Sequence, residues 1–467
     1  MGRHQIASSD GSLPINWEKK KLSEVLTTMK GKKPKLLEEA PSDLPFPYIN
    51  IKAFEKGIVN QFTDGKNCTF ANEEDVLIVW DGARCGLVGK GINGVVGSTL
   101  AKIVSHDIYN RYIYYFLQSQ YATINSQPRG VGIPHVDPGI FWNIDFPLAP
   151  YSDQERIVSK IEELFTQLDA AEAALLRAKK NLKRYQQSLL QAAVTGELTK
   201  EWREAHKDDL EPASKLLERI KAERKAKWEA EIRAKGKDPA KEKYKEPKIP
   251  DVSDLPVLPD GWCWVKTEDL VDVGTGATPL RSKLEYYEEG NIPWVTSGSL
   301  NNLFVEKASE FITILAIRET NVKLFPKGSL LIALYGEGKT RGKVSELKID
   351  STTNQAIAAL VFNDSAKPTK QYMKIFFRYN YDHIRRLSSG GVQPNLNLSI
   401  IKNTRIPLPS IQEQREILIE LENKEIIMEE INQSFKNNLL RIKSLRNSIL
   451  YQAFTGKLIT PQIEEIE

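Results

Sequence analysis

The feature that most constrains this chain is an internal repeat. A shift of 260 residues aligns 134–198 with 394–458, and the offset stays constant over more than sixty residues. Nearer the N-terminus the offset is 245, where Trp17 matches Trp262. Self-similarity at a fixed offset indicates a duplicated structural unit. We therefore expect a tandem repeat in 467 residues, in which the segment after Lys207 belongs to the first copy alone.

Each copy contains a long heptad pattern, with apolar residues in alternating steps of four and three that are typical of a coiled coil. From Ser152 to Gly196 a helix would measure about 65 Å at ~1.5 Å per residue. Ser152-Asp153 is the expected N-cap and Gly196 the expected stop. The predicted seam residues are Ile157, Ile161, Leu164, Leu168, Leu175, Leu182 and Leu189 in the first copy, and Ile417, Leu421, Met428, Ile431, Phe435, Ile442, Leu445 and Ile449 in the second.

The two long helices require partners, because each seam is too long for a domain of this size to cover. We expect them to pair with each other; the alternative is two separate surface helices, each on its own domain. The remaining segments read as mixed α/β. Strands are expected at Asp75–Trp80 and Ser329–Leu334, helices at Asn110–Ser119 and Thr369–Tyr379, a charged helix at Pro212–Ala234 that Gly236 stops, and an extended linker at Lys235–Pro259.

These patterns predict five segments. They are a first α/β domain at 1–150, a first spacer helix at 151–200, a charged helix and linker at 201–257, a second α/β domain at 258–409, and a second spacer helix at 410–467. Trp17 and Trp262 are expected to pack at a domain edge.

Composition excludes several classes of protein. No apolar run approaches the ~20 residues of a membrane helix, and the first residues contain no apolar signal-peptide core. Cys68, Cys85 and Cys263 lie far apart, so we expect no disulfide framework or zinc ribbon, and a reducing cytoplasm fits. The five histidines show no metalloprotease spacing, and no metal ligand set is expected. The net charge of +4 and pI near 8.6 hint at an acidic partner.

Two glycine motifs suggest enzyme chemistry but match poorly. Gly338-Lys339-Thr340 follows an apolar run, yet Ala333 stands where a phosphate loop needs its first glycine. Val273–Gly276 resembles a methyltransferase loop, but no Asn-Pro-Pro-Tyr or Asp-Pro-Pro-Tyr tetrapeptide accompanies it. We expect a non-catalytic protein, with a hidden active site as the alternative class.

Glycine-rich loops that carry cationic or amide side chains occur at comparable places in both copies. They span Asp81–Gly86 and Gln127–His135 in the first, and Tyr335–Lys343 and Ser388–Asn395 in the second. Glycine lets a backbone approach a ligand closely, and these side chains hydrogen-bond base edges and phosphates; plain solvated turns are the alternative. The candidate DNA-binding residues are Arg84, Gln127, Arg129, His135, Lys339, Arg341, Lys343, Gln393 and Asn395.

The chain resembles the specificity subunits of type I restriction–modification systems over essentially its whole length. The strings that carry the resemblance are Thr275-Gly-Ala-Thr-Pro279, Asn291-Ile-Pro-Trp-Val-Thr-Ser297, Ile406-Pro-Leu-Pro-Ser-Ile-Gln-Glu-Gln-Arg415 with its twin Phe146–Arg156, Gln191–Thr199 with Trp202-Arg203, Leu216–Arg224, and Gln452–Leu458. The first domain departs more, because Gly31-Lys-Lys-Pro34 replaces the Gly-Thr-Pro type of start.

The resemblance implies an α+β fold: two α/β target recognition domains joined by two long antiparallel coiled-coil helices, as a pseudo-two-fold tandem repeat. Each domain would read one half of a bipartite, asymmetric sequence in double-stranded DNA. The subunit would recruit two modification (methyltransferase) subunits and two restriction (ATP-dependent translocase and endonuclease) subunits in the cytoplasm of a prokaryote. S-adenosylmethionine, ATP and Mg would bind those partners, with no cofactor in this chain. The alternative within this class is an orphan DNA-binding or scaffold protein that acts without a restriction partner.

Overall fold

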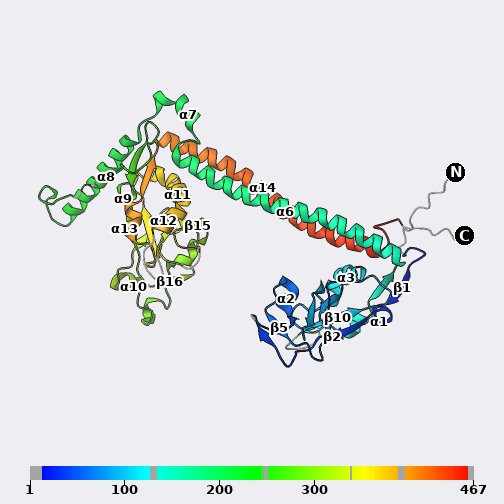
Figure 1. Ribbon diagram of the computed structural model, residues 1–467. Coiled ribbons are helices and arrows are strands. Elements are labelled where there is room, and N and C mark those ends of the chain that lie inside the picture. Colours follow the sequence, from blue (N-terminus) through cyan, green and yellow to red (C-terminus); the bar gives the residue numbers. More distant parts are fainter. Residues whose placement is uncertain are drawn as a thin grey trace. The chain divides into compact units, whose positions relative to one another are not determined.

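The structure is a computed structural model that describes residues 13–40, 42–126, 134–244, 246, 251–336, 339–387 and 395–460. The chain divides into two compact units. The first unit combines residues up to Ala178 with those from Gln433 onward, and the second unit is Lys179–Asn432. Both boundaries cut a long helix. Each unit therefore contains one globular domain, the start of the helix that follows that domain, and the end of the other copy's helix (Figure 1).

The globular domain of the first unit is built on a four-stranded antiparallel sheet in the order β2-β10-β7-β8. All four residues of its strand β7 are buried, which explains the continuous Val-Leu-Ile-Val run. A second sheet has the order β3-β5-β4-β9-β6, and β1 pairs with β11. The strands are β1 Glu18–Lys21, β2 Thr27–Lys30, β3 Glu38–Glu39, β4 Phe46–Ile49, β5 Gln61–Thr63, β6 Phe70–Ala71, β7 Val76–Val79, β8 Val88–Lys90, β9 Gly94–Val96, β10 Leu100–Val104 and β11 Asp145–Leu148; the helices are α1 Leu22–Val25, α2 Ile51–Lys56, α3 Asn110–Ser119, α4 Tyr121–Ile124 and α5 Pro138–Trp142.

The globular domain of the second unit repeats this plan. A five-stranded sheet has the order β13-β21-β18-β19-β15, a four-stranded sheet the order β16-β14-β20-β17, and β12 pairs with β22. The strands are β12 Cys263–Lys266, β13 Asp272–Thr275, β14 Ile292–Val295, β15 Phe304–Val305, β16 Glu310–Ile312, β17 Leu324–Phe325, β18 Leu330–Ala333, β19 Val344–Leu347, β20 Ser351–Thr353, β21 Ile357–Val361 and β22 Arg405–Leu408; the helices are α9 Thr267–Leu270, α10 Ile314–Glu319, α11 Lys370–Tyr379, α12 Tyr381–Arg386 and α13 Leu398–Asn403, with short 3₁₀ turns η3 Leu284–Tyr286, η4 Ser297–Asn301 and η5 Lys367–Thr369.

The elements expected from sequence are confirmed. Strands β7 and β18 lie inside the predicted runs, α3 has the predicted bounds, and α11 begins one residue later than predicted. The charged segment between the copies forms α7 Lys200–Ala205, η1 Lys207–Asp209 and α8 Ala213–Ala234. Helix α8 is followed by Gly236 at φ 75°, as expected. The described part of the linker adds only the 3₁₀ turn η2 Pro239–Lys241.

The long helices are α6 Tyr151–Thr195 and α14 Ile411–Phe454, and they run antiparallel in each unit. In the first unit the start of α6 shares a core with the end of α14, so Ile157 packs with Leu450 and Phe454. In the second unit the end of α6 (Leu189) packs with the start of α14 (Ile417). The tandem repeat with antiparallel helices is therefore confirmed, and the alternative of two separate surface helices is wrong.

The helix ends follow one prediction and correct another. Gly196 and Gly456, at φ 77° and 71°, stop the two long helices as expected. The predicted N-cap is wrong, because α6 already begins at Tyr151 and places Ser152-Asp153 in its first turn. The Asp153 carboxylate faces Arg156 there at 2.8 Å, so this acidic side chain forms an ion pair within the helix.

Burial along the predicted seam is uneven. The side chains near the helix ends are buried, whereas those between them are half-buried or exposed. The buried members are Ile157, Ile161, Leu189, Ile417, Leu421, Met428 and Ile442; the half-buried members are Leu164, Leu168, Leu175, Leu182, Phe435 and Ile449; the exposed members are Ile431 and Leu445. The domains therefore supply most of the covering surface, and the middle of each helix is the less covered part.

A buried acidic residue joins domain to helix in each unit. In the second unit Glu413, at 1% exposure, accepts hydrogen bonds from Trp262 Nε1 at 2.7 Å, Thr199 Oγ1 at 2.7 Å and Arg203 at 2.6 Å. In the first unit Asp153 occupies the equivalent position. Trp17 and Trp262 are both buried, which confirms that these tryptophans pack at a domain edge.

Candidate nucleic-acid interface

The glycine-bearing loop of the first domain, here named the first loop, spans residues 80–87 between β7 and β8. Its ends are closed by hydrogen bonds from Gly86 N to Val79 O at 2.8 Å and from Val79 N to Leu87 O at 2.8 Å. Trp80 N donates to Thr99 O at 2.9 Å, which fixes the loop to the turn before β10. The sheet therefore holds both ends of the loop while its tip remains at the domain surface.

The second domain builds the same loop with two more residues. This second loop spans residues 334–343 between β18 and β19, and residues 337–338 lie outside the described part. Gly342 N donates to Ala333 O at 2.8 Å, Ala333 N to Lys343 O at 3.0 Å, and Leu334 N to Ala356 O at 2.8 Å. Gly86 and Gly342 have φ values of 88° and 85°, a conformation that glycine adopts without strain. The duplication thus extends to the backbone geometry of these loops.

The structure brings the predicted loops together in pairs. In the first domain Val136 N donates to Trp80 O at 2.9 Å, and Gly82 N donates to Pro134 O at 2.7 Å. In the second domain Leu396 N donates to Leu334 O at 3.1 Å. The ends of the Gln127–His135 and Ser388–Asn395 segments therefore lie against the first and second loops. Gln127, Arg129 and Gln393 themselves lie outside the described residues.

Acidic side chains orient the cations of the first loop. Arg84 is 63% exposed and pairs with Glu55 of α2 at 2.5 Å. Asp81 holds two groups, because its carboxylate lies 3.0 Å from His135 Nδ1 and 2.8 Å from Lys30 Nζ. Sequence reasoning missed Lys30, Asp81 and Glu55 as members of this site. Lys30 directly precedes Gly31, the glycine at which the repeat aligns with Gly276, and that position was the available signal.

The second loop is organised by an amide and an aromatic residue. Asn301 Oδ1 accepts from Lys343 Nζ at 2.9 Å and from Thr340 Oγ1 at 3.2 Å. From helix α12, the Tyr381 hydroxyl donates to the Lys339 carbonyl at 2.6 Å, and Arg385 donates to the Arg341 carbonyl at 2.7 Å. The loop is thus fixed on both sides. Its Lys339 side chain is exposed, and Asn395 is half-buried beside it in sequence.

The second-loop partners Asn301, Tyr381 and Arg385 were also missed. Arg385 belongs to a basic run at the end of α12, His383, Arg385 and Arg386, which follows the predicted helix Thr369–Tyr379. That run was the only sequence signal for this side of the loop. Tyr381 and Arg385 also stack, with 5.1 Å between the guanidinium and the ring centroid.

The geometry does not support a phosphate loop at Gly338-Lys339-Thr340. In a phosphate loop the Lys-Ser/Thr pair opens a helix whose N-terminus faces the phosphates. Here the described residues after Thr340 continue through Lys343 into strand β19. Among the described residues no cluster of His, Cys, Asp and Glu could hold a metal ion. What both loops offer is a set of fixed Lys, Arg and His donors suited to phosphates and base edges.

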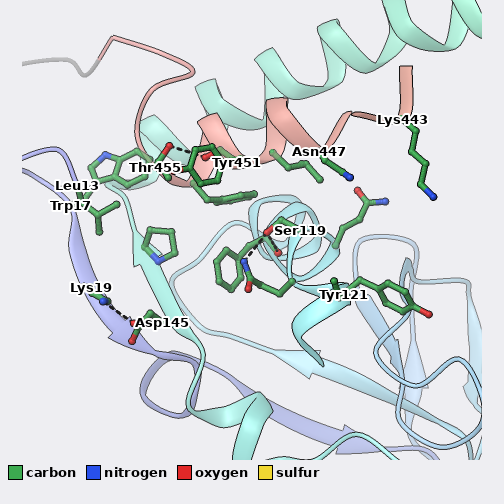
Figure 2. Close-up of a pocket in the computed structure, with 17 residues that line it drawn as sticks. Leu13, Trp17, Lys19, Ser119, Tyr121, Asp145, Lys443, Asn447, Tyr451 and Thr455 are labelled. Atoms are coloured by element: carbon green, nitrogen blue, oxygen red, sulfur yellow. Dashed lines mark hydrogen bonds and ion pairs between the residues drawn. The ribbon is translucent and has the colours of Figure 1, made fainter. Parts of the chain in front are cut away.

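A separate groove of about 1040 Å³ lies in the first unit and contains none of the predicted DNA-binding residues. It is formed by β1, the α3–α4 turn, β11 and the last turns of α14. Figure 2 shows Trp17, Tyr121 and Tyr451 around it, with Lys19 paired to Asp145. No helix in the described part of the chain is long and apolar enough to cross a membrane.

Comparisons with known proteins agree with this geometry. The family model described as the type I restriction modification DNA specificity domain matches residues 14–179 and 259–457. The type I restriction enzyme MjaVIII specificity subunit of Methanocaldococcus jannaschii is 23% identical, over 96% of this chain and 94% of that protein. The EcoDI specificity subunit of Escherichia coli is 25% identical, over 96% of this chain and 90% of that protein.

Solved structures show the same fold. A chain from a study of complex assembly and conformational transition of the type I R-M system matches with a TM-score of 0.64 at 17% identity, covering 96% of this chain and 99% of that one. The HsdS subunit of Thermoanaerobacter tengcongensis matches with a TM-score of 0.53 at 17% identity, with the same coverage.

Proposed function

Because this chain belongs to the type I restriction modification DNA specificity family, we propose that it reads a bipartite, asymmetric sequence in double-stranded DNA. One domain would read each half-site. The observation that carries this proposal is the duplicated loop: the same closed backbone geometry presents different donors in the two copies. Arg84 and His135 occupy the first site, and Lys339, Arg341, Lys343 and Asn395 the second. Unequal side chains on equal frames suit two different DNA words.

We propose that two modification subunits bind this chain and that two restriction subunits join them, in the cytoplasm of a prokaryotic cell. S-adenosylmethionine, ATP and Mg would bind those partners rather than this chain. The duplication supports the stoichiometry, since two copies of one surface can bind two copies of one partner. Purification of the chain with its modification subunits, followed by mass measurement of the complex, tests this stoichiometry.

The direct test of the proposal is the pattern of adenine methylation in the host genome. A bipartite motif should disappear when this chain is deleted and return with a plasmid copy. A methylated continuous palindrome that depends on this chain would contradict the proposal. An orphan protein without a restriction partner would give the same methylation but no restriction of unmethylated phage DNA.

Substitutions in the two loops should relax different halves of the motif. Replacing Arg84 with Ala should cost about 1–3 kcal/mol of discrimination at one position of one half-site, and replacing Lys343 with Ala should do so in the other half. Methylome sequencing of each variant measures the effect. Relaxation of both halves by a single variant would show that the domains do not read separately.

We further propose that the paired helices set the gap between the half-sites. One heptad inserted into α6 after Ala178 and one into α14 after Asn432 would lengthen the pair by about 10 Å. The gap in the methylated motif should grow by about 3 base pairs at ~3.4 Å each. Seven residues inserted after Gly236, outside both helices, form the control and should leave the gap unchanged. An unaltered gap in the double insertion would refute the ruler.

A further inference from the structure

The positive charge of this chain is concentrated in one projecting segment. We name residues 221–244, the distal part of α8 and the chain that returns from it, the arm. It contains nine Lys and Arg against five Asp and Glu. Its net charge of +4 equals that of the whole chain, so the other residues together are neutral. A segment of this kind attracts an anionic partner through its local field.

The arm is anchored at its base and solvated beyond it. Arg224 donates to the Glu268 carbonyl and pairs with Asp272 at 3.2 Å, while Glu223 accepts from the backbone N–H groups of Asp364 and Ser365 at 3.0 and 2.8 Å. Farther along, no residue from 225 to 244 is buried. In Figure 1 the far end of α8 stands clear of the rest of the second unit. The domain core therefore does not require this part of the helix.

The returning chain is held against the helix, which keeps the arm in one shape. The rings of Trp228 and Tyr244 pack with 5.2 Å between centroids. Lys237 pairs with Glu242 at 2.8 Å across the turn, and Arg233 pairs with Glu229 at 3.1 Å along the helix. These contacts satisfy three of the acidic and basic groups each way and leave a surplus of cations. The four fully exposed lysines without an ion pair in this described segment are Lys225, Lys235, Lys241 and Lys243.

We propose that the arm binds the phosphate backbone of the DNA duplex outside the bases that the second loop reads. Its attachment supports a position outside the half-site. Asp272, which holds Arg224, pairs with Val361 at one end of the sheet, whereas the second loop follows Ala333, which pairs with Ile357 at the other end. Contacts of this kind add affinity without sequence information. This inference rests on the proposed DNA-reading function and adds to it a second, sequence-independent contact.

The proposal is tested with the full chain in complex with its modification subunits. In the arm variant Lys225, Lys235, Lys241 and Lys243 are replaced by Gln, which preserves helix propensity at Lys225. In the control variant Gln replaces four exposed lysines elsewhere in the second unit: Lys200, Lys307, Lys323 and Lys327. Binding to a duplex with the methylated motif and to a scrambled duplex is measured over a series of KCl concentrations.

The arm variant should bind both duplexes more weakly, on the order of tenfold at low salt, and its salt slope should fall by about 3 to 4 because each phosphate contact contributes about 0.9. The preference for the motif over the scrambled duplex should stay unchanged. Equal slopes in the arm variant and the unmodified chain would overturn the proposal, as would an equal loss in the control. Loss of the modification subunits from the arm variant, with DNA binding by the chain itself intact, would assign the arm to a protein partner instead. If the unmodified complex shows no preference for the motif, the proposed function fails, whatever the arm does.

Discussion

Replacing Glu413 with Ala should destabilise the second unit by about 3–5 kcal/mol, the cost of removing one partner from a buried ion pair. The carboxylate is buried and accepts from three groups, so its loss leaves Trp262 Nε1, Thr199 Oγ1 and Arg203 without their acceptor. Arg203 is itself only 11% exposed, so water replaces the lost ion pair poorly. Urea unfolding followed by tryptophan fluorescence measures the effect, because Trp262 reports directly on this junction.

Two further variants separate the causes of this loss. Glu413→Gln keeps an acceptor for Trp262 but removes the charge that pairs with Arg203, so its cost should lie between zero and that of the Ala variant. Glu422→Ala, at an exposed position of the same helix, should change the free energy of unfolding by less than about 0.5 kcal/mol. A cost for Glu413→Ala as small as that for Glu422→Ala would show that the junction does not stabilise the unit.

The second large effect is expected at Glu346 of β19. Its carboxylate is 4% exposed and faces three ammonium groups: Lys348 at 3.0 Å, Lys370 at 3.1 Å and Lys374 at 3.5 Å. Lys374 is 8% exposed and also lies 3.8 Å from the centre of the Phe304 ring. Glu346→Ala would leave this buried ammonium without a counter-charge and should cost about 3–5 kcal/mol. Thermal unfolding checks this value, with the exposed Glu306→Ala as the matched control.

The same carboxylate should make stability depend on pH. Burial alone would raise the pKa of Glu346, but hydrogen bonds from Gln371, Lys348 and Lys370 outweigh burial and lower it to about 2. Because the folded pKa lies below the usual 4.5, this contribution of about 3 kcal/mol is complete above pH ~4.5 and is lost as pH falls toward about 2. Acid titration of the free energy of unfolding should show a shallower slope in Glu346→Gln. Identical slopes would contradict this account.

The repeat and the heptads made the architecture predictable, because both are local or periodic signals. The fixed offset placed α6 and α14, and continuous apolar runs placed β7 and β18. The site was predictable only in part. Lys343 and Arg84 stand in recognisable glycine loops, but Asn301, 42 residues before Lys343, carries no local mark of its contact. Glu55 and Asp81, which orient Arg84 and His135, look like ordinary surface acids in sequence. Pairing between distant residues is decided by the tertiary fold.

The two junctions also differ in what their closure requires of the chain. Asp153 finds its cation three residues away, so that ion pair forms as soon as the first turn of α6 exists. Glu413 needs Trp262, 151 residues distant, and Arg203, 210 residues distant. Loop-closure entropy delays contacts of such separation. The second junction should therefore form after the folding transition state, and its substitutions should accelerate unfolding while leaving the folding rate almost unchanged.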